Sequence, residues 1–93
     1  MGLLSEAQIQ DQLRKLNGWK LEGKEIGKRY QFKDFVRAMG FVNSVALVAE
    51  GMDHHPDIDI RWNKVKLSLS THSAGGLTEK DFKLAVMIDE LLG

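Results

Sequence analysis

The sequence has no cysteine, which excludes disulfide bonds and thiolate metal sites. It also has no excess of charge of either sign, because 13 lysines and arginines balance 13 aspartates and glutamates. Nucleic-acid-binding domains usually carry a basic excess, so this class is disfavoured. No stretch approaches the roughly 20 apolar residues that a membrane span needs, and the apolar lead at residues 1–5 is too short for a signal peptide. These absences favour a soluble cytoplasmic protein that binds neither nucleic acid nor a membrane.

The composition that remains is that of a small globular domain. The chain has 93 residues, of which 43% are hydrophobic, so we expect one domain spanning residues 1–93. A domain of this size buries only about 60–65% of the surface that its unfolded chain exposes. Oligomerisation would therefore help to stabilise it.

Three segments have helical patterns. Ser5 and Gln8 have the spacing of a capping box, and an apolar stripe at helical spacing follows them. Asp34 can cap a second helix that runs to about Met52, and Thr78 begins a third. The apolar surface of the second helix is wider than one stripe. It is therefore expected to cover a sheet with one face and to meet another partner, such as a second subunit, with the other.

Two β-hairpins lie between these helices. The first joins residues 19–22 and 25–32 through Gly23-Lys24, which sets Leu21 opposite Ile26. In the second, alternating residues on either side of Asn63-Lys64 predict two strands and a turn. The order helix, strand, strand, helix, strand, strand, helix predicts an α+β fold, α-β-β-α-β-β-α, in which three helices pack on one face of a four-stranded antiparallel sheet.

The three histidines are expected to meet beside the second hairpin. His54 and His55 are adjacent and precede Pro56, the only proline. A turn at Asn63-Lys64 pairs Trp62 with Val65, and the same register continued outward sets His55 opposite His72. Directly opposed residues have Cβ atoms about 4.5–5.5 Å apart. Because proline interrupts a strand ladder, the prediction is proximity of the imidazoles rather than a regular pair.

Three interpretations of this cluster stay open from the residues alone. The histidines can be surface or capping residues with no joint role. They can bind zinc or iron together with Glu50 and Asp53, although neighbouring side chains tend to point apart and the H-E-x-x-H spacing is missing. They can also perform acid–base chemistry, because imidazole alone has an unperturbed pKa close to neutrality.

A motif of several parts resembles the signature of the pterin-4a-carbinolamine dehydratases. It consists of Glu50, His54-His55-Pro56, Trp62, Thr71-His72 and Asp81. The spacing matches at every element, and the likeness extends from about Gly18 to Ile88. The resemblance implies dehydration of 4a-hydroxytetrahydropterin to quinonoid dihydropterin, which regenerates the tetrahydrobiopterin cofactor of aromatic amino-acid hydroxylases. It implies no metal and no other cofactor.

The resemblance also assigns roles to residues. It makes His54, His55 and His72 the catalytic set, and it places Glu50, Asp53, Pro56, Ser70, Thr71 and Asp81 at the substrate. Acids would orient imidazoles or accept hydrogen bonds from pterin N–H groups, and Ser70 and Thr71 would contact the ring edge. Asp81 has a competing role as an acid in the first turn of a helix. Trp62 can equally well pack in the sheet or stack on the pterin.

Members of this family form dimers or tetramers, which implies a homo-oligomer, and a hydroxylase can act in the same pathway. Some animal members bind the dimerisation segment of a homeodomain transcription factor as coactivators. The alternative function is therefore a non-catalytic interaction module on the same fold, with vestigial histidines.

Overall fold

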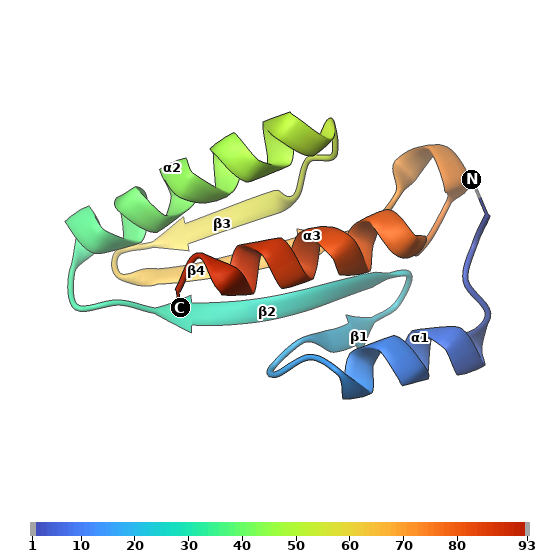
Figure 1. The fold of residues 1–93 in the computed structure, drawn as a ribbon. Helices are drawn as coiled ribbons and strands as arrows, with labels where there is room; N and C mark the ends of the chain where they lie inside the picture. Colours follow the sequence, from blue (N-terminus) through green and yellow to red (C-terminus); the bar gives the residue numbers. More distant parts are fainter. Residues whose placement is uncertain (1, 93) are drawn as a thin grey trace.

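The computed structural model describes residues 2–92 and has the predicted order of elements. The helices are α1 (Glu6–Arg14), α2 (Phe35–Met52) and α3 (Glu79–Glu90), with a short 3₁₀ helix, η1 (His72–Ala74). The strands are β1 (Lys20–Glu22), β2 (Glu25–Gln31), β3 (Asp57–Arg61) and β4 (Lys64–Leu69). They form one antiparallel sheet in the order β1-β2-β4-β3. α2 and α3 run side by side over the sheet, and α1 lies beside β1 (Figure 1), which confirms the α+β prediction.

Side-chain caps fix where the helices begin. Ser5 and Gln8 form the predicted capping box of α1, and the Asp34 carboxylate accepts a hydrogen bond from the backbone N–H of Arg37. Thr78 caps α3. In the first hairpin Leu21 pairs with Ile26, as the two-residue turn predicts.

The core lies between the sheet and the helices. Alternate residues of the two central strands, β2 and β4, point toward α2 and α3. Burial is nearly complete for Ile26, Tyr30, Val65, Leu67 and Leu69 from the strands and for Ala38, Phe41, Val45, Ala49, Phe82, Leu84, Ala85 and Ile88 from the helices. This core fixes the ends of the second hairpin and of α2 and α3 relative to one another.

α2 has the wide apolar surface that its sequence predicts. Contrary to the prediction that no stretch approaches a membrane span, the 18 residues of α2 are long and apolar enough to cross a membrane, by length and composition alone. In this fold Ala38, Phe41, Val45 and Ala49 of α2 are buried. Val36 and Leu47, in contrast, are 75% and 77% exposed.

The predicted register of the second hairpin is wrong by two residues. β3 and β4 pair Ile58 with Leu67 and Ile60 with Val65, so the turn is Trp62-Asn63 and not Asn63-Lys64. Trp62 adopts a left-handed φ of 53° there, as two-residue hairpin turns require. A shift of two residues keeps every side chain on its own face, so apolar residues meet apolar residues in either register.

Trp62 consequently has neither of its two expected roles. It is 65% exposed at the turn, at the end of the hairpin away from Pro56, and it does not pack in the sheet. The neighbouring Asn63 fixes the turn instead. Its side-chain amide donates to the backbone carbonyl of Phe32, and its backbone carbonyl accepts from the Phe32 N–H.

Asp89 in α3 joins the helix layer to the first hairpin. Its carboxylate accepts hydrogen bonds from Trp19 Nε1 at 2.9 Å, from Lys28 Nζ at 2.9 Å and from the Tyr30 hydroxyl at 2.8 Å. This cluster explains how Lys28, the polar residue between Ile26 and Tyr30, is accommodated on the helix-covered face of β2. Burial, together with the hydrogen bond and charge of Asp89, raises the pKa of Tyr30 above its ordinary value of 10.0.

Tyr30 is the only tyrosine, so its ionisation can be followed by ultraviolet absorbance. We expect no phenolate signal at pH values near and above 10.0 while the protein stays folded. The unfolded chain releases this proton at about pH 10, so the stability contributed by neutral Tyr30 is complete below that pH and falls above it. Tyr30→Phe should remove this contribution. A phenolate signal near the ordinary pKa in a protein with native circular dichroism would contradict the expectation.

Candidate active site

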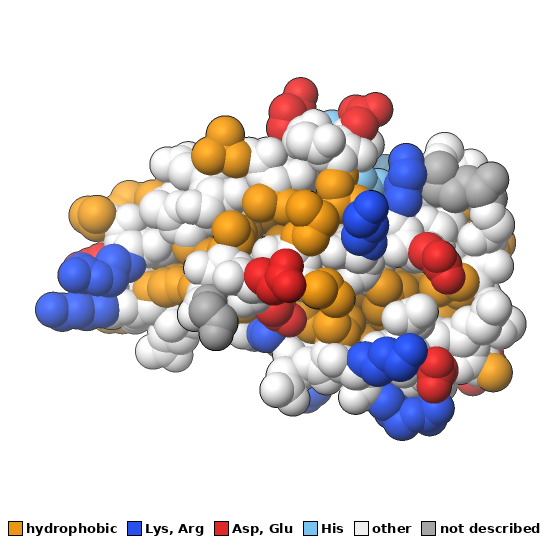
Figure 2. All heavy atoms as spheres, viewed as in Figure 1, with side chains coloured by type: hydrophobic (Ala, Val, Ile, Leu, Met, Phe, Trp, Pro, Cys, Tyr) orange, Lys and Arg blue, Asp and Glu red, His pale blue; other side chains and the backbone are white. Residues whose placement is uncertain are grey.

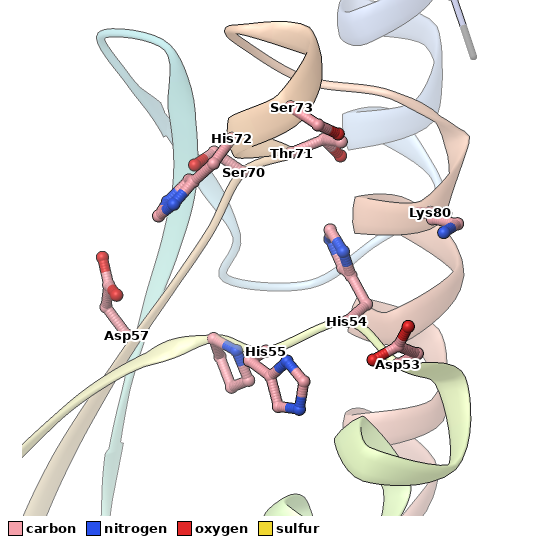
Figure 3. Close-up of a pocket in the computed structure, with 10 residues that line it drawn as sticks. Asp53, His54, His55, Asp57, Ser70, Thr71, His72, Ser73 and Lys80 are labelled. Atoms are coloured by element: carbon pink, nitrogen blue, oxygen red, sulfur yellow. The ribbon is translucent and has the colours of Figure 1, made fainter.

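A pocket of about 460 Å³ lies at the end of the second hairpin opposite its turn. Its walls come from the α2–β3 connection, from the segment that follows β4, and from the first turn of α3 (Figure 3). It is lined by Asp53, His54, His55, Pro56, Asp57, Ser70, Thr71, His72, Ser73 and Lys80. The fold therefore brings the three histidines to one pocket, although by a different register from the one predicted.

The end of α2 separates the two adjacent histidines. Asp53 follows the helix in a left-handed conformation with φ of 52°, which aspartate tolerates better than most residues. The His54 N–H returns to the Ala49 carbonyl at 3.1 Å. This reversal directs His54 into the protein, where it is buried, and leaves His55 exposed.

His54 is held by a buried carboxylate. Its Nε2 lies 2.6 Å from Asp81 Oδ1, and the side chains of the two residues are 9% and 0% exposed. A carboxylate only accepts, so Nε2 carries a proton, and in the neutral imidazole Nδ1 then has the free lone pair. Within residues 2–92 every fully buried side-chain nitrogen and oxygen has a hydrogen-bond partner. Nδ1 forms no hydrogen bond with another described residue, so it is not fully buried, and His54 itself lines the pocket.

Asp81 does not line the pocket itself but contacts two residues that do, His54 and Thr71. Its Oδ2 accepts hydrogen bonds from the Thr71 hydroxyl and from the Thr78 backbone N–H, both at 2.9 Å. Asp81 is also in the first turn of α3, where the helix dipole favours a negative charge. The two expected roles of this residue therefore occur together.

His55 and His72 are more accessible than His54. The His55 side chain is 59% exposed, and its Nε2 lies 2.7 Å from Oε1 of Glu50, whose side chain is 80% exposed. Glu50 thus lies outside the pocket lining and contacts it through His55. His72 begins η1 and is exposed, and Figure 3 shows it on the wall opposite His54 and His55.

The remaining residues of the predicted site all lie in the pocket wall. Asp53, Pro56, Ser70 and Thr71 line the pocket. Sequence reasoning missed Asp57, Ser73 and Lys80, each of which directly follows or precedes a motif residue in the chain. It also missed the contribution of Thr78, for which the Thr78-x-x-Asp81 capping-box spacing was the available signal.

The geometry does not assemble the metal site that was considered from the sequence. In the described part of the chain, no group of three or more histidine, aspartate and glutamate side chains is arranged to hold a metal ion. His54 and His55 instead contact different carboxylates. What the pocket offers is a buried, oriented imidazole on one wall and exposed imidazoles around it, which suits proton transfer.

Comparison with known proteins gives a consistent set of relatives. A family model described as pterin 4 alpha carbinolamine dehydratase matches residues 2–91. Proteins named "Putative pterin-4-alpha-carbinolamine dehydratase" from Roseiflexus sp. (strain RS-1) and Chloroflexus aurantiacus are 56% and 54% identical to this chain. The first alignment covers 96% of each chain, and the second covers 100% of each.

Solved structures share the fold. A transcriptional coactivator/pterin dehydratase from Brucella melitensis has a TM-score of 0.94 and 39% identity, with 99% of this chain and 100% of that chain covered. A pterin dehydratase-like protein identified as a RuBisCO assembly factor in the alpha-carboxysome has a TM-score of 0.72 and 25% identity. The alignment covers 83% of this chain and 92% of that one.

Proposed function

This chain belongs to the pterin-4a-carbinolamine dehydratase family, and from that premise we propose that it dehydrates 4a-hydroxytetrahydropterin to quinonoid dihydropterin. The observation that carries the proposal is the pocket in which His54, His55 and His72 meet. Its volume of about 460 Å³ is in the range of small-molecule sites, about 300–1,000 Å³. The reaction regenerates a pterin cofactor in the cytoplasm and needs no metal.

The proposed reaction removes one water by two proton transfers. His54 Nδ1, with its free lone pair, takes the proton from N5 of the pterin. The N–H electron pair then forms the N5=C4a double bond, and the hydroxide on C4a leaves as water after it accepts a proton. That single proton comes from one of the two exposed imidazoles, His55 or His72. Each transfer by a positioned side chain is typically worth about 10²–10⁴-fold.

The other pocket residues are proposed to bind the pterin ring. Asp53 and Asp57 can accept hydrogen bonds from its N–H groups, and Ser70 can contact its edge. Pro56 gives a rigid apolar surface between the two walls. Glu50 orients His55, with which it is in contact at 2.7 Å, and Asp81 with Thr71 orients His54 in the same way.

A turnover assay with 4a-hydroxytetrahydropterin tests this proposal. We expect the purified chain to accelerate dehydration well above the spontaneous rate and to keep full activity after exhaustive chelation. A rate equal to the spontaneous one would refute the enzymatic function. Loss of activity on chelation would restore the metal interpretation of the histidines.

The second candidate function is that of a non-catalytic interaction module. Its support is that one structural relative is described as a coactivator as well as a dehydratase, and another as a RuBisCO assembly factor. The same assay separates the candidates, because a pure interaction module would leave the spontaneous rate unchanged. A hydroxylase partner in the same pathway belongs to the enzymatic proposal alone.

We also propose that the chain forms a homodimer or homotetramer through its helical face. Hydrophobic side chains gather on this face (Figure 2), and Val36, Leu47 and Val86 are exposed there. Leu47→Glu would place a charge in the contact, so we expect a smaller species by light scattering with unchanged circular dichroism. Gln31→Glu, an exposed residue of β2, is the matched control. An unchanged mass for Leu47→Glu would exclude this part of α2 from an interface.

A further inference from the structure

Two buried threonines lie behind the pocket wall that carries His54. Thr71 and Thr78 are 3% and 1% exposed, and their hydroxyl oxygens are 2.8 Å apart. Thr71 also contacts Asp81 Oδ2 at 2.9 Å, and Asp81 Oδ1 contacts His54 Nε2 at 2.6 Å. A continuous series of hydrogen bonds thus runs from Thr78 to the imidazole.

The protons in this series have only one consistent order. A carboxylate accepts and does not donate, so the single Thr71 proton is donated to Asp81. Thr71 then has no proton left for its contact with Thr78, and the Thr78 hydroxyl must donate to Thr71. Thr78 Oγ1 in turn accepts from the Lys80 backbone N–H at 3.3 Å. The Thr78 hydroxyl therefore donates to Thr71, and the Thr71 hydroxyl donates to Asp81.

We propose that Thr78 is a positioning residue for the dehydration, acting through Thr71 and Asp81 to keep the proton of His54 on Nε2. This inference rests on the proposed function. The hydrogen bonds from Thr71 and from the Thr78 backbone N–H occupy Asp81 Oδ2, so Oδ1 is the oxygen that is left for His54. Donation from Thr78 polarises the Thr71 hydroxyl and strengthens its hydrogen bond to the carboxylate.

The loop that carries His72 is closed by a backbone hydrogen bond and by the hydrogen bond between the two threonine hydroxyls. The Thr71 N–H donates to the Gly76 carbonyl at 2.8 Å, which closes the segment between Thr71 and Thr78 into a compact loop. Because His72 directly follows Thr71, the Thr71–Thr78 hydrogen bond ties the wall with His72 to the wall with His54. An N-cap alone requires only that Thr78 accept from the start of α3, so this donated hydrogen bond is a feature beyond capping.

The test compares Thr78→Val, which removes the hydroxyl, with Thr78→Ser, which keeps it. For Thr78→Val we expect kcat to fall about tenfold, as for the loss of one buried hydrogen bond, with little change in KM. Nitrogen NMR of labelled imidazoles should show His54 losing its uniform Nε2–H tautomer. Thr78→Ser should restore both readouts. Ser5→Ala, which removes the corresponding cap of α1, is the matched control and should lower stability without changing kcat.

Thr71→Val provides a second test, since it removes the donor to Asp81 without removing the cap of α3. It should reduce kcat more than Thr78→Val does. Wild-type kcat and an unchanged His54 tautomer in folded Thr71→Val, or in folded Thr78→Val, would overturn the positioning role. An equal fall of kcat in Ser5→Ala would also overturn it, because the effect would then follow stability alone. If the wild-type chain shows no turnover, the proposed function fails, whereas the tautomer measurement still decides the role of Thr78.

Discussion

Replacement of His54 by alanine is expected to lower kcat for dehydration by about 10²–10⁴-fold. His54 is the imidazole whose free nitrogen and proton position are both set by the protein, through Asp81 at 2.6 Å. Water at the vacated position would have neither the basicity nor the orientation of Nδ1. The measurement is the single-turnover rate with 4a-hydroxytetrahydropterin, compared with the spontaneous rate under the same conditions.

The effect on folding should distinguish His54 from the other histidines. His54→Ala leaves a buried Asp81 oxygen without its partner, at a cost of about 1–3 kcal/mol, so thermal unfolding should shift downward. His55→Ala and His72→Ala remove exposed side chains and should leave stability nearly unchanged. Trp62→Ala is the activity control, because Trp62 belongs to the same sequence motif yet lies outside the pocket. Wild-type kcat in His54→Ala would rule out the proposed base.

The elements of the fold were predictable because local signals agree with one another. Ser5, Asp34 and Thr78 are each a capping residue followed by a periodic apolar segment, and each does begin a helix. The Gly23-Lys24 turn fixed the first hairpin in its register. In these places the turn residues and the apolar pattern specify the same structure.

In the second hairpin, local signals did not determine the register of the two strands. The apolar pattern of β3 and β4 has a period of two, so it cannot distinguish registers that differ by two residues. The deciding interaction is nonlocal, since Asn63 is held by Phe32 at the end of the other hairpin. No signal within the hairpin itself points to that contact.

The candidate site was predictable in its members and not in its arrangement. The motif identified the histidines and Asp81. The adjacency of His54 and His55 in the sequence does not indicate that His54 is buried while His55 is exposed. That difference arises from the left-handed Asp53 at the end of α2. In the same way, the spacing of Thr78 and Asp81 indicates a helix cap without indicating that the second oxygen of the carboxylate reaches His54.

Asp81→Asn is expected to have an effect as large as that of His54→Ala, because the hydrogen bonds around Asp81 dictate how the amide must lie. The Thr71 hydroxyl and the Thr78 N–H both donate to the Oδ2 position, so the amide oxygen takes that place. The amide NH₂ group then faces His54 Nε2 and donates to it. Nε2 must accept, which moves the imidazole proton to Nδ1, the atom that is proposed to take the N5 proton.

The corresponding aspartate-to-asparagine change in serine proteases, which also leaves a histidine in the wrong tautomer, lowers kcat by about 10⁴, and we expect a loss of this order here. Asp81→Ala is the informative comparison, since it removes the partner of His54 without forcing a tautomer. It should therefore lose less activity than Asp81→Asn while losing more stability, because Thr71 and the first turn of α3 both lose their acceptor. Nitrogen NMR of His54 should report the proton on Nδ1 in Asp81→Asn only. The opposite order of activities would mean that the carboxylate acts through its charge and not through the tautomer of His54.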